Sequence, residues 1–165
     1  MQYDLPNINR GLYLFNKSLS DYNFFKSGGN ADVMFFPGSI EELTFFLKEF
    51  RHKNKLFVIG AGSNLLVRDS GFRGVVISLK NLNNIVFYKN EIVCGCGVLN
   101  SKLFNFAKAN GIADYEFFGL IPGTVGGSCK MNAGCYGQSI SDILVYIEAV
   151  DFYGNIKRFN VDDFE

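Results

Sequence analysis

The chain has 165 residues, 48% of them hydrophobic and 19% charged, which excludes a disordered protein and suffices for one folded unit with its own core. Sixteen Lys and Arg residues balance sixteen Asp and Glu residues, so no net positive field favours binding to nucleic acid. Residues 1–19 mix polar and apolar types unlike a signal peptide. No apolar run is long enough to span a bilayer, so no membrane association is expected.

The first half of the chain alternates strand and helix patterns. Apolar residues 31–36 and 56–59 each end at a turn-forming residue, so both segments are predicted to be buried strands. A helix is predicted between them: Ser39 is a suitable N-cap, Glu42 is spaced to reach back to the backbone N–H of Ser39, and apolar residues recur with helical spacing up to Phe50. Strand, helix and strand in this order begin an α/β layer.

Shorter elements follow residue 60. Three β-prone stretches at 75–79, 85–88 and 91–93 predict an antiparallel meander. A second helix is predicted to start with Asn100 as its N-cap and to end just before Gly111.

The last part of the chain has the pattern of a hairpin. Residues 143–150 and 156–159 are β-prone and are separated by a Tyr-Gly-Asn turn. Residues 161–165 predict the start of another helix or a turn.

A first glycine-rich loop, Gly-Ala-Gly-Ser-Asn-Leu-Leu at residues 60–66, directly follows a predicted strand. Small residues in a chain reversal expose consecutive backbone N–H groups, which bind phosphate oxygens. A Rossmann dinucleotide loop is disfavoured, because Leu65 stands at its third glycine position and no helix pattern follows. A purely structural turn remains an alternative at this point.

A second glycine-rich stretch covers residues 119–137 and holds six glycines in nineteen residues. Ordering so many glycines costs chain entropy, which indicates that the backbone must approach something closely, such as a large flat ligand. Two tight turns in a β-rich unit are the alternative. If the first interpretation holds, the loops at 60–66 and 121–128 face each other across a slot.

Three motifs in order carry a family resemblance: residues 23–32 (Asn-Phe-Phe-Lys-Ser-Gly-Gly-Asn-Ala-Asp), residues 60–66, and residues 119–127 with 131–137. Together they resemble the UDP-N-acetylenolpyruvoylglucosamine reductase family of bacterial cell-wall enzymes. The resemblance implies an α+β fold, the FAD-binding domain of the p-cresol methylhydroxylase/vanillyl-alcohol oxidase type. FAD would lie between two α+β subdomains, at about residues 1–79 and 80–165, and a separate substrate-binding domain would be absent.

The resemblance also implies which residues hold the cofactor. The first loop would line the FAD pyrophosphate, the second would approach the isoalloxazine ring, and three later residues would complete the pocket. The expected cofactor-binding residues are Gly60, Ala61, Gly62, Ser63, Asn64, Leu65, Leu66, Gly119, Ile121, Pro122, Gly123, Thr124, Val125, Gly126, Gly127, Ser128, Asn132, Gly134 and Tyr136.

In that family a hydride passes from NADPH to FAD and then to the enolpyruvyl double bond of a UDP-sugar, giving UDP-N-acetylmuramate for peptidoglycan. Family members carry a Tyr-Arg pair soon after the segment matching residues 161–165, and a serine proton donor and a glutamate in a later domain. This chain has none of these, so we expect it to bind FAD without turnover by itself. A flavin-dependent oxidase of the same fold and a non-catalytic fragment are the alternatives.

Two residues depart from the family pattern in the first motif. Phe24 stands where the family usually has threonine, and Ser27 where it has an aliphatic residue, so the contact of this segment with the cofactor is not implied. Lys26 fits the family's basic position, and a solvated surface lysine is its alternative interpretation.

The remaining reactive side chains point to no catalytic or metal site. Cys94, Cys96, Cys129 and Cys135 lack a zinc-site spacing, which indicates free thiols and a cytoplasmic protein. His52 follows Arg51 at a predicted helix end, where positive charge is favourable without any catalytic role. The sequence does not indicate an oligomeric state.

Overall fold

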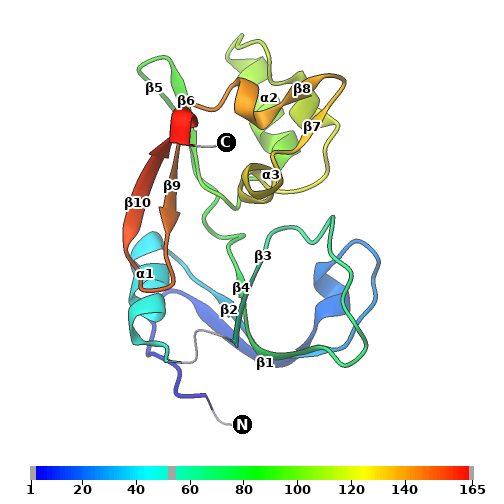
Figure 1. The fold of residues 1–165 in the computed structure, drawn as a ribbon, viewed down its shortest axis with the longest axis vertical. Coiled ribbons are helices and arrows are strands. Elements are labelled where there is room, and N and C mark those ends of the chain that lie inside the picture. Colours follow the sequence, from blue (N-terminus) through cyan, green and yellow to red (C-terminus); the bar gives the residue numbers. More distant parts are fainter. Residues whose placement is uncertain (1–2, 52–54, 164–165) are drawn as a thin grey trace.

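The computed structural model describes residues 3–51 and 55–163, so His52 and the last two residues of the 161–165 segment lie outside the described residues. The described chain forms two parts (Figure 1). The lower part is a four-stranded sheet with helix α1, and the upper part gathers helices α2 and α3 with short strand pairs.

The sheet has the strand order β1-β2-β4-β3. Strand β1 is antiparallel to β2, and both β2 and β3 are parallel to β4. The elements of this part are β1 (Leu12–Ser18), β2 (Asn30–Phe36), α1 (Ile40–Glu49), β3 (Leu56–Ile59) and β4 (Phe72–Ser78), with a short 3-10 helix over Leu19–Tyr22. The predicted strands at 31–36 and 56–59 and the helix between them are confirmed.

The predicted meander is wrong in its first strand. Residues 75–78 belong to β4, which lies between β2 and β3 and runs parallel to both. Val75, Val76 and Ile77 are each at most 1% exposed, because both faces of this central strand are covered. A run of apolar residues without alternation is typical of such a strand.

Each face of the sheet has its own core. Below α1, Phe35 packs against Phe46 with tilted rings whose centroids are 4.4 Å apart, and Phe46 stacks on Phe50 at 5.0 Å. On the other face, Met34 and Phe36 pack with Leu19 of the 3-10 helix.

The N-terminus of α1 agrees with the prediction only in part. The Ser39 hydroxyl accepts a hydrogen bond from the backbone N–H of Glu42, at 3.3 Å, as expected for an N-cap. The Glu42 carboxylate, however, does not reach back to Ser39. It accepts instead from the backbone N–H groups of Asn9, Arg10 and Gly38, because the segment before β1 passes directly over this end of the helix.

The upper part has a separate core made by Val98, Leu103, Phe117, Phe118, Val125 and Ile140. Its elements are β5 (Ile85–Tyr88), β6 (Glu91–Cys94), α2 (Asn100–Ala109), α3 (Val125–Met131), β7 (Gly134–Cys135) and β8 (Gln138–Ser139), with 3-10 helices over Glu116–Gly119 and Ile140–Asp142. The pairing of β5 with β6 is antiparallel, as predicted.

The two helices of this part differ from the sequence prediction at their N-terminal ends. Leu99 is the N-cap of α2, and Asn100 is the first helical residue, with its side chain buried. Gly111 follows α2 with φ of +69°, as predicted for a residue just past a helix. Helix α3 was not predicted, because its glycines suppress the helical signal and tertiary contacts must stabilise it.

The predicted hairpin is confirmed as β9 (Tyr146–Val150) and β10 (Ile156–Asn160), followed by a 3-10 turn over Val161–Asp163. Its tip returns to the lower part and lies beside α1 (Figure 1). A Cβ on Gly154 would collide with the backbone of Thr44, and Val150 packs on the core under α1. The hairpin thus connects both parts. The subdomain division expected after residue 79 places the whole hairpin in the second subdomain.

Candidate functional site

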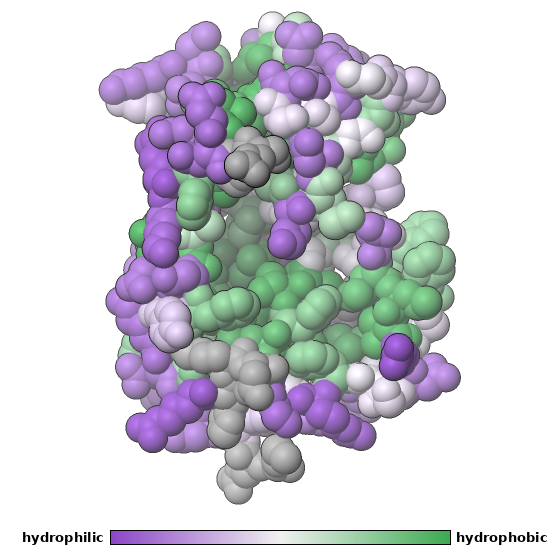
Figure 2. Space-filling view, in the orientation of Figure 1, coloured by the Kyte–Doolittle hydropathy of each residue, from purple (hydrophilic) through white to green (hydrophobic). Residues whose placement is uncertain are grey.

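A cleft of about 790 Å³ lies between the two parts and is lined by segments from both. The space-filling view shows a hollow at mid-height between the upper and lower parts (Figure 2). The volume falls within the range of about 300–1,000 Å³ that is usual for sites that bind small molecules and cofactors.

The two glycine-rich loops face each other at this cleft, as the sequence predicts. A Cβ placed on Gly60 would lie 2.7 Å from the Thr124 hydroxyl oxygen. A Cβ placed on Gly123, whose φ is +145°, would lie 3.2 Å from the Ser63 hydroxyl oxygen. Side chains at either glycine would therefore fill the gap between the loops, which explains why both positions lack one.

Six of the expected cofactor-binding residues line the cleft: Gly60, Ala61, Ser63, Pro122, Gly123 and Thr124. They come equally from the end of β3 and from the turn before α3, so the two loops contribute one wall each.

The rest of the first loop is turned away from the cleft or supports it. A Cβ on Gly62, whose φ is +70°, would collide with the Tyr22 carbonyl, and the Gly62 carbonyl accepts a hydrogen bond from the Phe24 N–H at 3.0 Å. Leu65 packs on the sheet core, whereas Asn64 and Leu66 are exposed. Residues 60–71 contain no helix, which confirms that this is not a Rossmann loop.

The rest of the second loop forms the start of α3. The Thr124 hydroxyl accepts from the Gly127 N–H and caps the helix, and Val125 is buried. A Cβ on Gly126 would lie 2.7 Å from the Cys96 Cβ, so this glycine permits packing within the upper part. Gly119 packs similarly against Phe104.

The three last expected residues lie beyond α3 and are not among the residues that line the cleft. Asn132 ends α3 in a left-handed conformation, with φ of 42°. Gly134 belongs to β7, and the Tyr136 side chain is 92% exposed.

Asn100 supports the second loop from inside α2, a role that the sequence did not reveal. Its side-chain Nδ2 donates to the Ile121 carbonyl at 3.0 Å and to the Ser128 hydroxyl at 2.8 Å, and its backbone N–H donates to the Gly123 carbonyl at 3.0 Å. The residue is 1% exposed. It therefore holds both ends and the centre of the turn that faces the cleft.

Three lysines give the cleft a positive charge: Lys26, Lys80 and Lys102. Asp21 also lines the cleft, but its carboxylate is already paired with Lys17 at 2.7 Å. Cations beside exposed backbone N–H groups favour a ligand that carries phosphate. Lys80 and Lys102 are isolated in the sequence, so no local pattern marked them.

Within residues 3–51 and 55–163, no group of three or more metal-binding side chains is placed to hold a metal ion, and all four cysteines are free. Burial, and next the nearby thiols of Cys129 and Cys96, raise the pKa of Cys94 to about 11. Such thiols are poor nucleophiles at neutral pH. None of the helices in these same residues is both long and apolar enough to cross a membrane.

Comparisons with known proteins agree with this geometry. A family model described as FAD binding domain matches residues 31–160. The UDP-N-acetylenolpyruvoylglucosamine reductase of Rickettsia akari (strain Hartford) is 44% identical over 156 residues, which make up 94% of this chain and 52% of that protein. The chain therefore spans about half the length of the curated relatives that it matches.

Solved structures show the same fold. UDP-N-acetylenolpyruvylglucosamine reductase from Thermus caldophilus superposes with a TM-score of 0.76 and 29% identity, over 93% of this chain and 53% of that one. p-Cresol methylhydroxylase, at 16% identity, shares the fold with a TM-score of 0.59, over 81% of this chain and 28% of that one. The expected α+β fold of this type is confirmed, and the chain belongs to the FAD-binding domain family.

Proposed function

We propose that this chain is the FAD-binding part of a UDP-N-acetylenolpyruvoylglucosamine reductase. The observation that carries the proposal is the cleft between two facing glycine loops, with lysines on its walls. The identity of 43–45% to proteins of that name supports it, as does the agreement with the Thermus caldophilus structure.

In this proposal the residues of the chain bind and orient the cofactor. Backbone N–H groups of the Gly60–Ser63 turn, together with the lysines, hold the diphosphate, whose charge they offset. Pro122, Gly123 and Thr124 approach the flat ring, because no side chain at Gly123 blocks it. When bound, FAD supplies the hydride chemistry, and the protein supplies position and charge.

The finer parts of the activity belong to the whole protein. NADPH as the hydride donor, a UDP-sugar as the substrate and a role in peptidoglycan synthesis are proposed from the names of the relatives. The chain offers no catalytic residue of its own in this proposal, and its location in the cytoplasm stays a prediction.

Calorimetric titration of the folded chain with FAD tests the proposal. We expect saturable binding and a shifted flavin absorption spectrum. Gly60→Val should abolish binding, because its side chain would collide with the Thr124 hydroxyl and fill the space between the two loops. Gly137→Ala is the control for affinity: no described residue lies within 4 Å of a Cβ there, so its φ of +83° should lower stability but leave FAD binding unchanged. A folded chain that does not bind FAD would refute the proposal.

A flavin-dependent oxidase is the second candidate, because p-cresol methylhydroxylase shares this fold. Some enzymes of that type attach FAD covalently. Acid precipitation of the loaded chain separates the two: a reductase-type domain releases all its flavin to the supernatant, whereas a yellow pellet would favour the oxidase.

A further inference from the structure

Phe24 combines a fixed backbone with an exposed ring. Its side chain is 71% exposed, although the segment around it is held by buried hydrogen bonds. An exposed aromatic side chain on a rigid segment is well suited to binding, because little conformational entropy is lost when a ligand covers it.

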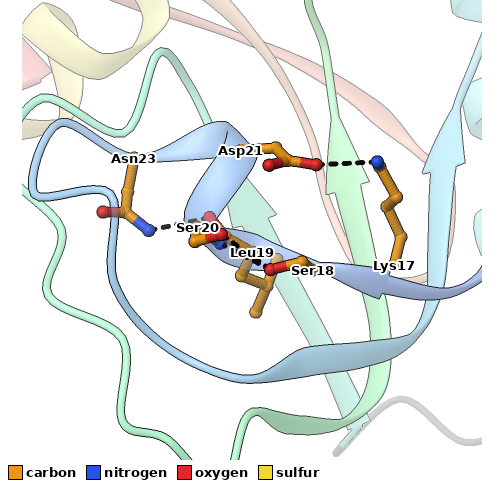
Figure 3. Close-up of polar contacts among 6 residues, drawn as sticks. All are labelled: Lys17, Ser18, Leu19, Ser20, Asp21 and Asn23. Atoms are coloured by element: carbon orange, nitrogen blue, oxygen red, sulfur yellow. Dashed lines mark hydrogen bonds and ion pairs between the residues drawn. The ribbon is translucent and has the colours of Figure 1, made fainter.

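The anchoring comes from Asn23, which is 2% exposed. Its Nδ2 donates to the Leu19 carbonyl at 2.7 Å and to the Ser27 carbonyl at 2.8 Å, closing the turn on both sides of Phe24. Figure 3 shows the Asn23 side chain directed at the backbone of the preceding 3-10 helix. The Lys17–Asp21 ion pair joins the end of β1 to the same 3-10 helix and so helps to fix the start of this segment.

A further hydrogen bond joins Phe24 to the glycine loop. Its backbone N–H donates to the Gly62 carbonyl at 3.0 Å. The Phe24 side chain is thus placed at a set position beside the loop proposed to hold the diphosphate, and it lines the cleft together with Lys26. Phe25 contacts the Phe24 ring edge to face, with centroids 6.0 Å apart.

We propose that Phe24 is a stacking platform for one flat ring system of the bound dinucleotide, either the adenine or the isoalloxazine. The inference rests on the proposed binding of FAD. It explains why a large apolar ring, 71% exposed, is left in solvent beside a lysine at the mouth of the cleft. Stacking of a base on an aromatic ring requires only a flat, accessible face, which Phe24 provides.

The test uses the full chain and three ligands, FAD, ADP and FMN, titrated by calorimetry into the parent protein and the variants Phe24→Ala and Phe24→Tyr. Phe24→Ala should weaken FAD binding by about 5- to 100-fold, the usual range for loss of one stacked base, and Phe24→Tyr should keep it. Phe15→Ala is the matched control, because Phe15 is 67% exposed on β1 and does not line this cleft.

The two smaller ligands identify the ring. If ADP binding weakens and FMN binding does not, the adenine stacks on Phe24. If FMN binding alone weakens, the isoalloxazine does. Either result supports the proposal. Unchanged affinity of Phe24→Ala for all three ligands would overturn it, and so would an equal loss in Phe15→Ala. A parent protein that binds no FAD would instead refute the proposed function itself.

Discussion

The Asn100 side-chain amide donates a hydrogen bond to the Ser128 hydroxyl at 2.8 Å, which joins the first turn of α2 to α3 in the interior of the upper part. Both residues are less than 5% exposed. The turn that carries Gly123 lies between Ile121 and Ser128, so its shape depends on this buried link.

Asn100→Ala should destabilise the chain by about 2–4 kcal/mol, because it leaves the Ser128 hydroxyl and the Ile121 carbonyl without their donor in a buried site. Urea unfolding measures the change. Asn105→Ala, at an exposed position of the same helix, should stay within about 0.5 kcal/mol of the parent. Equal stability of the two variants would contradict the supporting role of Asn100.

Gly62 and Gly111 form a matched pair for testing the first loop. Their φ angles are +70° and +69°, but a Cβ on Gly62 would collide with the Tyr22 carbonyl, whereas none of the residues that the structure describes lies within 4 Å of one on Gly111. Gly111→Ala should cost about 1–2 kcal/mol, the price of a left-handed conformation alone. Gly62→Ala should cost clearly more in urea unfolding and should also weaken FAD binding, because the loop must move.

Lys102→Gln should weaken FAD binding by about 2- to 10-fold at low salt, since it removes one charge from the cleft wall. The loss should shrink as salt is added, because salt screens the attraction between Lys102 and the phosphates of FAD in the parent. Lys89→Gln, in the turn between β5 and β6 and away from the cleft, should bind as the parent does at every salt concentration. A loss that does not depend on salt would argue against a charge effect.

The partly buried thiols of Cys94 and Cys129 predict a loss of stability at alkaline pH. Burial first, and the nearby thiols next, raise the pKa of Cys94 from 9.0 to about 11, and burial followed by the effect of Cys96 raises that of Cys129 to about 11. The folded chain therefore holds these protons more tightly than the unfolded chain. Their contribution to stability is complete below pH 9 and is lost as the pH rises to about 11.

Urea unfolding between pH 8 and pH 11 measures this loss. The double variant Cys94→Ala/Cys129→Ala should show a shallower fall than the parent over that range, because the unfolded state no longer gains by releasing these protons. Cys135→Ala serves as the control. A parallel fall in parent and double variant would assign the alkaline loss to other groups.

Sequence periodicity located most elements of the lower part. The strands at 31–36 and 56–59 and the helix between them are long or strongly patterned, so local propensity and burial favour the same structure. Prediction failed where tertiary contacts decide. Strand β4 was assigned to the wrong neighbours, because residues 60–71 return the chain so that β4 inserts between β2 and β3 and runs parallel to both. Helix α3 was missed because Gly126 and Gly127 disfavour an isolated helix.

The sequence by itself determined the family motifs, the two glycine loops and their order, because close approach of backbone demands residues without a side chain. Only the tertiary structure decided that Gly60 meets Thr124 across the cleft, that Lys80 and Lys102 lie on its walls, and that Asn100 is a buried support and not a cap. These relationships join residues far apart in the chain. They depend on how two separately packed cores sit against each other, and no local pattern of residues encodes that.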